Sequence, residues 1–319
     1  MKQSMKAEDS FCVNIPKKGL WYNLSVNKTA YLLILPALVL VLLLCYLPFG
    51  GLILAFKDYN IVDGILGSPW VGFDNFVECF TQPNMLVAVK NSFVYGMVLQ
   101  FLGMPFPILL ALLFNEIRNI HFKKVVQTVS YLPYFLSWIT VVGLFSSMFS
   151  LEGTFNGILK SLIGDSYEAV NIMHNAKNFL PIIFWTHIWK SIGWSSVIFL
   201  AAITGIDPSY YEAATIDGCG KFKQVIYITL PCIKNTILIV FIMSLGSLFN
   251  TSFEQVYGFQ NVYIQQETDT INTLIYRLGI QNGKYSLATA FGLAQGLVAV
   301  ALLLFSNTVS KKLFEVSIW

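Results

Sequence analysis

The chain has 319 residues, of which 55% are hydrophobic and only 12% are charged, and its mean hydropathy is +0.64. Soluble domains carry about 25% charged residues, so the composition excludes an ordinary soluble domain and indicates a membrane protein. The formal net charge of +3 says little by itself, and the distribution of charge along the chain is more informative. No nucleic-acid partner is expected.

The N-terminal region, residues 1–28, is polar and mixed, and we expect it to form a cytoplasmic tail. The first apolar segment, residues 31–56, is too long for the core of a signal peptide, so we interpret it as a retained membrane span. The five cysteines are divided between the two sides of the predicted membrane and its interior, so no disulfide is expected.

Apolar segments recur along the chain and predict an all-α, polytopic membrane protein with six transmembrane helices. A helix needs about 20 residues to cross the hydrocarbon core at a rise of about 1.5 Å per residue. A backbone in lipid also has to satisfy its own hydrogen bonds, which favours helices. We therefore expect a transmembrane domain over residues 29–310, with helices at residues 31–56, 92–114, 125–149, 179–206, 235–253 and 285–310.

Lysine and arginine are distributed unequally between the two sides of the predicted membrane. Of the 20 basic residues, 13 fall in the N-terminal region, the second and fourth connections and residues 311–319, whereas 6 fall in the other connections and Lys190 lies within a span. Positive charge is enriched in cytoplasmic segments. Both termini, including the C-terminal tail at residues 311–319, and the connection at residues 207–234 are therefore predicted to be cytoplasmic.

One polar stretch between two apolar segments still has helical character. Asp-Pro-Ser at residues 207–209 is a helix-start signal, and Glu-Ala-Ala at residues 212–214 favours a helix. Gly218 interrupts the pattern, because a glycine inside a helix costs about 1 kcal/mol relative to alanine. A second short helix is expected from about Lys221 to Ile228. The sequence thus predicts a helix–glycine–helix hairpin between two spans.

The spacing of this stretch resembles the EAA loop of ATP-binding-cassette (ABC) importer permeases. The pattern Glu-Ala-Ala, three residues, Gly, nine residues, Ile-x-Leu-Pro is complete over residues 212–231. The variant Tyr-Glu-Ala-Ala-x-x-Asp-Gly resembles the carbohydrate (CUT1, maltose-type) branch. Motifs at residues 47–48 with 55–59, at 70–76, at 127–133 and at 317–319 are similar to the B-type permeases of polysaccharide and oligosaccharide importers. The alternative, an ordinary interfacial helix that ends at a glycine, is disfavoured by the spacing.

The resemblance implies a type I importer permease fold that carries a carbohydrate, an oligosaccharide, into a bacterial cell through its plasma (inner) membrane. The implied partners are a second, homologous permease in a heterodimer, two cytoplasmic ATPase subunits, an extracytoplasmic sugar-binding protein and membrane lipid. ATP and Mg would be bound by the ATPase subunits, and this chain would hold no cofactor or metal. The EAA loop, residues 207–231, would dock into the ATPases through Tyr211, Glu212, Ala213, Ala214, Asp217, Gly218, Ile228, Leu230 and Pro231.

The sequence shows no catalytic motif, so we expect a transport subunit without its own ATPase activity and not an enzyme. The stretch 279–285 has three residues between its glycines, where a phosphate-binding loop has four, and a tyrosine where Ser or Thr would bind magnesium. The histidines, His121, His174 and His187, lack the spacing of metal ligands. No nucleophile–base–orienter set is visible.

Polar residues within the predicted spans suggest a sugar path. His187, Lys190, Ser191 and Trp194 have helical spacing and share one stripe. Lys190 has two interpretations: it snorkels from near the outer end of the span, or it faces the transported sugar. By position, the resemblance to maltose-type permeases implies a path lined by His187, Lys190, Ser191, Trp194, Ser244, Ser247, Asn250, Thr251 and Glu254.

Other classes of function remain as alternatives. A permease for a non-sugar solute, such as an amino acid or phosphate, would share the EAA loop. An ion-coupled secondary transporter would need carboxylates within its spans, and only Glu254, at the edge of one, is available. The sequence leaves open which sugar, linkage and chain length are carried, and which ATPase and binding protein are used.

Overall fold

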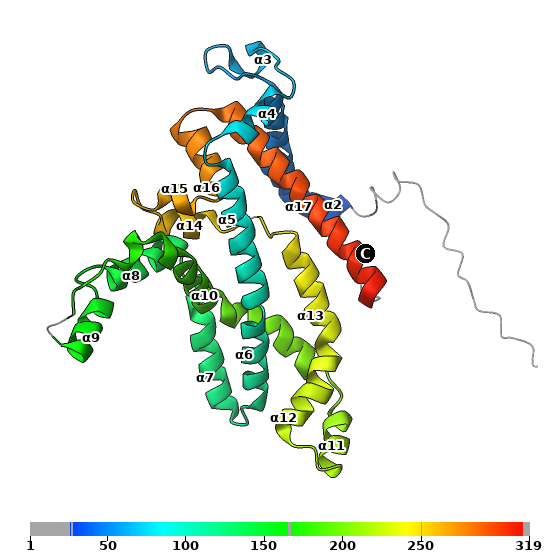
Figure 1. Ribbon diagram of the computed structural model, residues 1–319. Coiled ribbons are helices and arrows are strands. Elements are labelled where there is room, and N and C mark those ends of the chain that lie inside the picture. Colours follow the sequence, from blue (N-terminus) through cyan, green and yellow to red (C-terminus); the bar gives the residue numbers. More distant parts are fainter. Residues whose placement is uncertain (1–25, 27, 165–166, 250, 315–319) are drawn as a thin grey trace, which may run out of the picture. The chain divides into compact units, whose positions relative to one another are not determined.

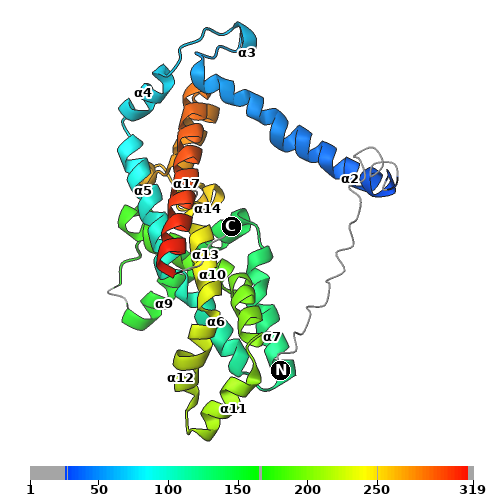
Figure 2. The same cartoon turned by 90° about the vertical axis from the view of Figure 1, so that its right-hand side faces the viewer.

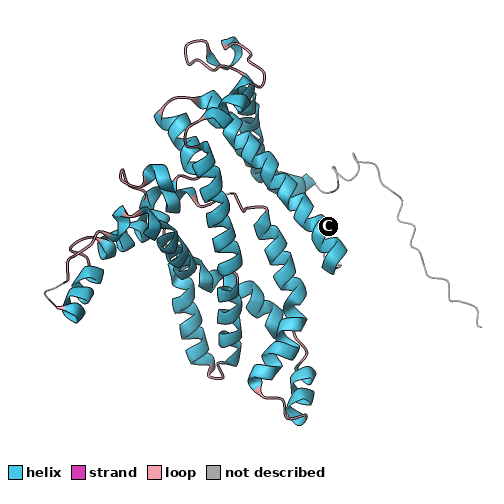
Figure 3. Ribbon diagram, viewed as in Figure 1, coloured by secondary structure: helices cyan, strands magenta, loops and turns pink. Residues whose placement is uncertain are grey.

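The computed structural model describes residues 26, 28–164, 167–249 and 251–314, and this part of the chain consists of helices and loops (Figure 3). The predicted all-α fold is confirmed, because the described ranges contain no β-strand and only an isolated bridge between Lys57 and Trp70. Most of the predicted N-terminal tail, the end of the C-terminal tail, the 317–319 motif and the candidate path residue Asn250 lie outside the described residues.

The chain divides into two units, Met1–Ile53 and Leu54–Trp319. A long apolar helical stretch, Lys28–Phe56, begins in the first unit. It consists of α2 (Lys28–Val41), the π-helical turn η1 (Leu42–Tyr46) and the 3₁₀ segment η2 (Leu47–Phe56). Every described side chain of α2 is exposed, and the helix is strongly apolar, so this surface suits lipid or another apolar partner.

The second unit contains the remaining helices. Its first half comprises α3 (Gly64–Gly67), α4 (Asp74–Thr81), α5 (Met85–Met97), η3 (Val98–Leu102), α6 (Pro105–Glu116), α7 (Ile120–Tyr131), η4 (Leu132–Phe135), α8 (Trp138–Phe149) and α9 (Thr154–Ile163). Its second half comprises η5 (Ile172–His174), α10 (Ala176–Thr204), α11 (Pro208–Ile216), α12 (Lys221–Gln224), η6 (Val225–Thr229), α13 (Leu230–Leu245), α14 (Phe253–Phe259), α15 (Gln265–Thr268), α16 (Ile271–Tyr276), η7 (Arg277–Gln281) and α17 (Tyr285–Phe314).

Five helices in the described part of the chain are long and apolar enough to cross a membrane. They are Lys28–Phe56, Met85–Glu116, Trp138–Ile163, Lys221–Leu245 and Tyr285–Lys312. A sixth candidate is the bent pair α10 and α11, whose axes differ by 69°. The structure therefore agrees with a multi-pass membrane protein, and four of the six predicted spans overlap these helices closely.

The predicted span 125–149 is wrong as a single helix. α7 ends at Tyr131, η4 follows, and Leu136 and Ser137 are extended before α8 begins. Pro133 lacks a backbone N–H and cannot continue the hydrogen-bonding pattern of α7, while the Ser137 hydroxyl accepts a hydrogen bond from the backbone N–H of Thr140 at 3.2 Å and caps α8. We call residues 132–137 the α7–α8 break.

The predicted span 235–253 is displaced along the chain. The helix begins at Lys221, continues through η6 into α13, and ends at Leu245 before Gly246. The predicted span was required to contain no charged residue, so it began after Lys234. In the structure this lysine is exposed and is accommodated in the helix. The helical span is therefore earlier in the chain, and residues 246–252 form the connection to α14.

α10 is the central helix of the second unit and packs against α6, α7, α13 and α14 (Figures 1 and 2). Phe199 and Ile203 of α10 are buried with Ala111 of α6 and Ile233 of α13. Gly193 allows α7 to approach, because a Cβ at this position would lie 1.9 Å from the carbonyl oxygen of Ser130. This close approach fixes α10 against the last turn of α7.

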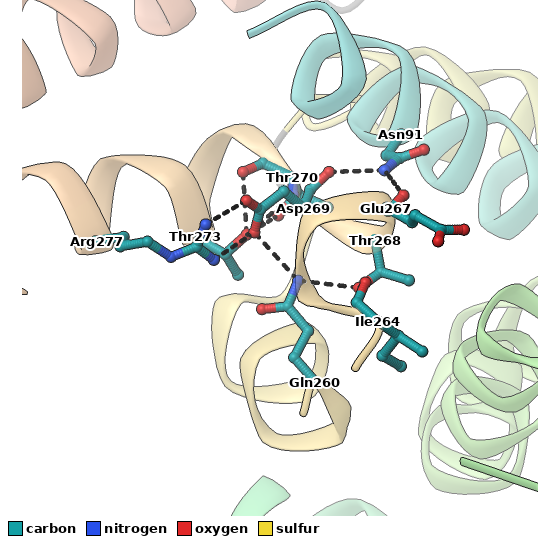
Figure 4. A network of polar contacts seen from close by, with 9 residues as sticks. All are labelled: Asn91, Gln260, Ile264, Glu267, Thr268, Asp269, Thr270, Thr273 and Arg277. Carbon is teal, nitrogen blue, oxygen red and sulfur yellow. Dashed lines mark hydrogen bonds and ion pairs between the residues drawn. The ribbon is translucent and has the colours of Figure 1, made fainter. Parts of the chain in front are cut away.

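A buried ion pair connects the short helices α14–α16 (Figure 4). The Arg277 guanidinium donates to both Asp269 carboxylate oxygens at 2.5 and 2.6 Å, and Gln260 and Thr273 donate to the same carboxylate. Asn91 of α5 donates to the backbone oxygen of Asp269 at 2.9 Å. The network thereby holds this region against the middle of α5.

Candidate functional site: the EAA hairpin and an intramembrane cavity

The predicted hairpin is present at residues 207–231, with α11 and α12 as its two helices. The Asp207 carboxylate caps α11 by accepting from the backbone N–H of Ser209 at 2.9 Å, which holds the pKa of this carboxyl below its ordinary value. Gly218 has a φ of +75° and ends α11. Its N–H donates to the Thr215 carbonyl and that of Cys219 to the Ala214 carbonyl, the hydrogen-bond pattern of a Schellman C-cap.

Side-chain hydrogen bonds brace the two arms of the hairpin. The hydroxyls of Tyr211 and Thr229 are 2.9 Å apart. Buried Gln224 donates to the Thr215 hydroxyl at 3.0 Å and to the Cys219 carbonyl at 3.2 Å. The sequence did not single out Gln224 and Thr229 as bracing residues, because neither differs from its neighbours until the fold brings the two arms together.

The outer surface of the hairpin is open to a partner. The Glu212 carboxylate is exposed and has no hydrogen bond or ion pair within the described ranges. Ile216 is 87% exposed and Phe222 is 78% exposed at the same end of the second unit. A shallow groove of about 540 Å³ lies beside Glu212, between α11 and α12. Exposed apolar side chains around a free carboxylate are typical of a protein docking surface.

The hairpin lies at the end of the second unit where α6 turns into α7 (Figures 1 and 2). An exposed ion pair of 3.4 Å between Lys221 and Glu116 of α6 links the two connections. From the hairpin, α12, η6 and α13 continue as one helical stretch from Lys221 to Leu245. Ile228, Leu230 and Pro231 of the motif are therefore part of this stretch, which leads from the hairpin into the bundle.

A cavity of about 470 Å³ lies among η3, α6, α10 and α13. Three of the predicted path residues line it, namely His187, Ser191 and Ser244. Gln100 and Ser195 also line it and were not predicted. Gln100 is a polar residue in an otherwise apolar span, which is the signal that could have identified it. The cavity wall is apolar with a few polar groups, as in many small-molecule sites.

Lys190 and Trp194 lie on the neighbouring side of α10, at the α7–α8 break. The Lys190 ammonium donates to the Tyr134 carbonyl at 2.6 Å. Trp194 stacks on the Tyr134 ring with 4.9 Å between centroids and 10° between planes. The predicted stripe is therefore divided. His187 and Ser191 line the cavity, whereas Lys190 and Trp194 do not and lie at the α7–α8 break.

The other predicted path residues lie after α13. Ser247 donates to the Ser244 carbonyl at 2.8 Å, Thr251 is buried, and Glu254 is exposed in the first turn of α14. None of these three lines the cavity described above. Asn250 lies outside the described residues.

The apolar helices, the intramembrane cavity and the exposed hairpin together define a membrane permease. Residues 103–316 match the family described as "Binding-protein-dependent transport system inner membrane component", and the chain belongs to this family. It is a multi-pass permease subunit of an ABC importer, and the resemblance to carbohydrate permeases is confirmed.

Individual relatives resemble the chain over nearly its full length. The polygalacturonan/rhamnogalacturonan transport system permease protein YteP of Bacillus subtilis (strain 168) is 38% identical over 95% of this chain and 94% of its own. Protein LplB of the same organism is 38% identical over 90% of this chain and 89% of its own. A solved bacterial ABC transporter involved in the import of the acidic polysaccharide alginate contains a chain with 35% identity and a TM-score of 0.83, covering 92% of this chain and 99% of that one.

Proposed function

We propose that this chain is the permease subunit through which a bacterial ABC importer moves an oligosaccharide into the cell. The observation that carries the proposal is the complete EAA hairpin with its exposed, unpartnered Glu212, in a chain that shares 38% identity with a polysaccharide permease. Sugar import in particular is supported by the names of the relatives and by the cavity beside α10, whose wall combines apolar and polar groups.

The complete importer requires further subunits. A second, homologous permease forms a heterodimer with this chain, and two cytoplasmic ATPases bind ATP and Mg and supply the energy. An external sugar-binding protein delivers the substrate, as suggested by a related alginate transporter that was solved with an alginate pentasaccharide-bound periplasmic protein. The hairpin and both termini face the cytoplasm in this proposal, in accordance with the distribution of basic residues.

The bracing of the hairpin suggests how ATPase movement reaches the sugar path. The Tyr211–Thr229 and Gln224–Thr215 hydrogen bonds make α11 and α12 move as one body. α12 continues into α13, whose Ser244 lines the cavity. A displacement of the hairpin on ATP-driven closure therefore moves the cavity wall, and alternation between inward- and outward-facing states follows from that coupling.

The substitution Glu212→Ala tests the docking role. We expect the variant permease to assemble in the membrane but to bind the ATPases about tenfold more weakly, because it loses a charge-assisted hydrogen bond. Glu152→Ala, an exposed carboxylate in the loop before α9, is the matched control. ATPase co-purification and sugar-stimulated hydrolysis in reconstituted vesicles are the measurements. Wild-type docking and stimulation by Glu212→Ala would show that this carboxylate does not couple the subunits.

A further inference from the structure

A buried glutamine of another helix is anchored beside His187, which lines the cavity. Gln255 of α14 has no solvent exposure. Its amide nitrogen donates to the Ile183 carbonyl at 2.8 Å and to the Thr186 hydroxyl at 3.0 Å. Ile183 lies one helical turn before His187 on α10, and Thr186 is the residue before it in the chain. The Gln255 side chain is therefore fixed next to His187.

These two hydrogen bonds also determine which atom of the Gln255 amide is left for His187. An amide side chain has two N–H donors and a carbonyl oxygen that only accepts. Both donors are used on α10, so Oε1 remains for a further contact. Gln255 acts on the imidazole of His187 as a side-chain hydrogen-bond partner. Oε1 and Nδ1 are the atoms available for this contact, because both are buried and neither has a hydrogen bond elsewhere in the described residues.

The contact with Gln255 determines where the imidazole of His187 carries its proton. An amide oxygen does not donate, so Nδ1 has to be the protonated nitrogen. In a neutral imidazole the other nitrogen, Nε2, then has a free lone pair and is an acceptor. The Trp138 ring stacks on the imidazole, with 6.3 Å between centroids and 20° between planes, and supports this orientation. His187 lines the cavity, so the lone pair of Nε2 is available to a molecule there.

Two serines of the cavity wall also offer acceptors. The Ser191 hydroxyl donates to the His187 carbonyl at 2.7 Å, and the Ser244 hydroxyl donates to the Phe241 carbonyl at 2.7 Å. A hydroxyl has a single proton, and in both serines this proton is used on the backbone of the same helix. The oxygen lone pairs remain for a ligand. These side chains therefore suit the hydroxyl groups of a sugar, which can donate, and not a group that only accepts.

We propose that Gln255 is a positioning residue, which holds His187 as the Nδ1–H tautomer so that Nε2 accepts a hydrogen bond from a hydroxyl group of the passing sugar. The inference rests on the proposed function and specifies which groups of the substrate the cavity recognises. The competing interpretation is a purely structural glutamine, which joins α14 to α10 and has no influence on the tautomer of His187.

Nitrogen-15 NMR of the histidine-labelled importer in vesicles measures the tautomer, at about pH 8, where an ordinary histidine is neutral. The signals lost in His187→Phe identify His187. We expect Nδ1 to be protonated in the wild type and in Gln255→Glu, which keeps an acceptor. In Gln255→Leu the proton should move to Nε2, because Nδ1–H would be a buried donor without an acceptor. Gln281→Leu, at an exposed glutamine, is the matched control and should behave as wild type. A proton on Nε2 and not on Nδ1 in the wild type would overturn the inference.

Uptake into the same vesicles distinguishes a positioning role from a structural one. Trigalacturonate is the probe, supplied at limiting concentration with the binding protein, and uptake is divided by the amount of assembled permease. Gln255→Leu and His187→Phe should each lower uptake about tenfold, the scale of one lost hydrogen bond, and the double variant should lose less than about twofold more.

Losses that multiply to about a hundredfold in the double variant would show that Gln255 does not act through His187, and would overturn the inference. Absence of trigalacturonate uptake by the wild type would count against the proposed function. The NMR measurement does not depend on transport, so the two failures are distinguishable.

Discussion

Asp269 carries a negative charge at a position with no solvent exposure. Its carboxylate is satisfied by Arg277, Gln260 and Thr273, so the desolvation cost of the charge is offset by four donated hydrogen bonds (Figure 4). Removing one member of a buried pair leaves the other charge uncompensated. The α14–α16 region therefore depends on both partners being present.

The substitution Asp269→Asn is expected to lower the free energy of unfolding by about 3 kcal/mol, because Arg277 loses its buried counter-charge. Glu78→Gln is the control, since Glu78 forms an exposed pair with Lys284 at 3.4 Å and exposed pairs contribute about 1 kcal/mol or less. Thermal unfolding of the detergent-purified importer measures both variants. Equal shifts in melting temperature would contradict the distinction between the buried and the exposed pair.

For single residues, the sequence predicts the position on a helix better than it predicts which side chains of other helices are in contact. The helical period places His187, Lys190, Ser191 and Trp194 on one stripe, and α10 is indeed continuous there. Which neighbour each residue meets depends on where α7 ends. That end is set by Pro133 and the extended residues after it, so the division of the stripe between cavity and break could not be predicted from periodicity.

The conformation of the hairpin follows directly from its own residues, its two glycines in particular. Gly218 has a φ of +75° and open space around its Cβ position, so any cost of substitution comes from the backbone and not from a clash. Gly220 has an ordinary φ of −68° and equally open surroundings. The two glycines of the hairpin therefore differ in backbone conformation but not in the space around them.

Gly218→Val should uncouple ATP hydrolysis from uptake while leaving docking partly intact, because a side chain in the left-handed region costs about 1–2 kcal/mol and opens the turn between α11 and α12. Gly220→Ala should remain close to wild type. Sugar-stimulated hydrolysis and uptake in the same vesicles, together with ATPase co-purification, give the comparison. If both variants remain coupled, the geometry of the Gly218 turn does not matter for transport.

Among the elements, the hairpin and most spans could be predicted, whereas the α7–α8 break and the start of α13 could not. Glycine, proline and capping residues determine structure locally, so the hairpin can be predicted from residues 207–231 alone. An apolar segment of about 20 residues, in contrast, predicts one membrane span and does not reveal an interruption of the helix within it, such as the one at Pro133. The requirement for a charge-free segment also left Lys234 out of the predicted fifth span, and this moved the predicted span toward the C-terminus.

For the whole molecule, the distribution of basic residues predicts the direction of the chain across the membrane. Val62 is 89% exposed in the connection between η2 and α5, which we place outside the cell, and Lys223 is exposed in the hairpin, which we place inside. Native Cys79, in the outer connection, is buried, and burial raises the pKa of its thiol to about 12. The reactive thiolate form is therefore negligible at neutral pH.

A membrane-impermeant maleimide applied to intact cells should modify Val62→Cys and should modify neither Lys223→Cys nor the wild-type chain. After permeabilisation, Lys223→Cys should react more strongly than the wild type, whose Cys219 and Cys232 lie in the same connection, and this difference controls for accessibility. Labelling of Lys223→Cys in intact cells would reverse the proposed orientation. Labelling of the wild type before permeabilisation would show that one of its native cysteines, which include exposed Cys45 and Cys232, is reached from outside.

The close approach of α7 to α10 at Gly193 limits which residues position 193 can accept. Every missense change at this codon introduces a Cβ, and even alanine places one 1.9 Å from a backbone oxygen of α7. A library of random point mutants should therefore be depleted at codon 193 as severely as at codon 218, although Gly193 belongs to neither the cavity lining nor the hairpin. We expect depletion at codon 193 to result from lost assembly, and depletion at codon 218 to result from an assembled transporter that no longer couples. Genetic intolerance alone therefore does not identify the residues that act in transport.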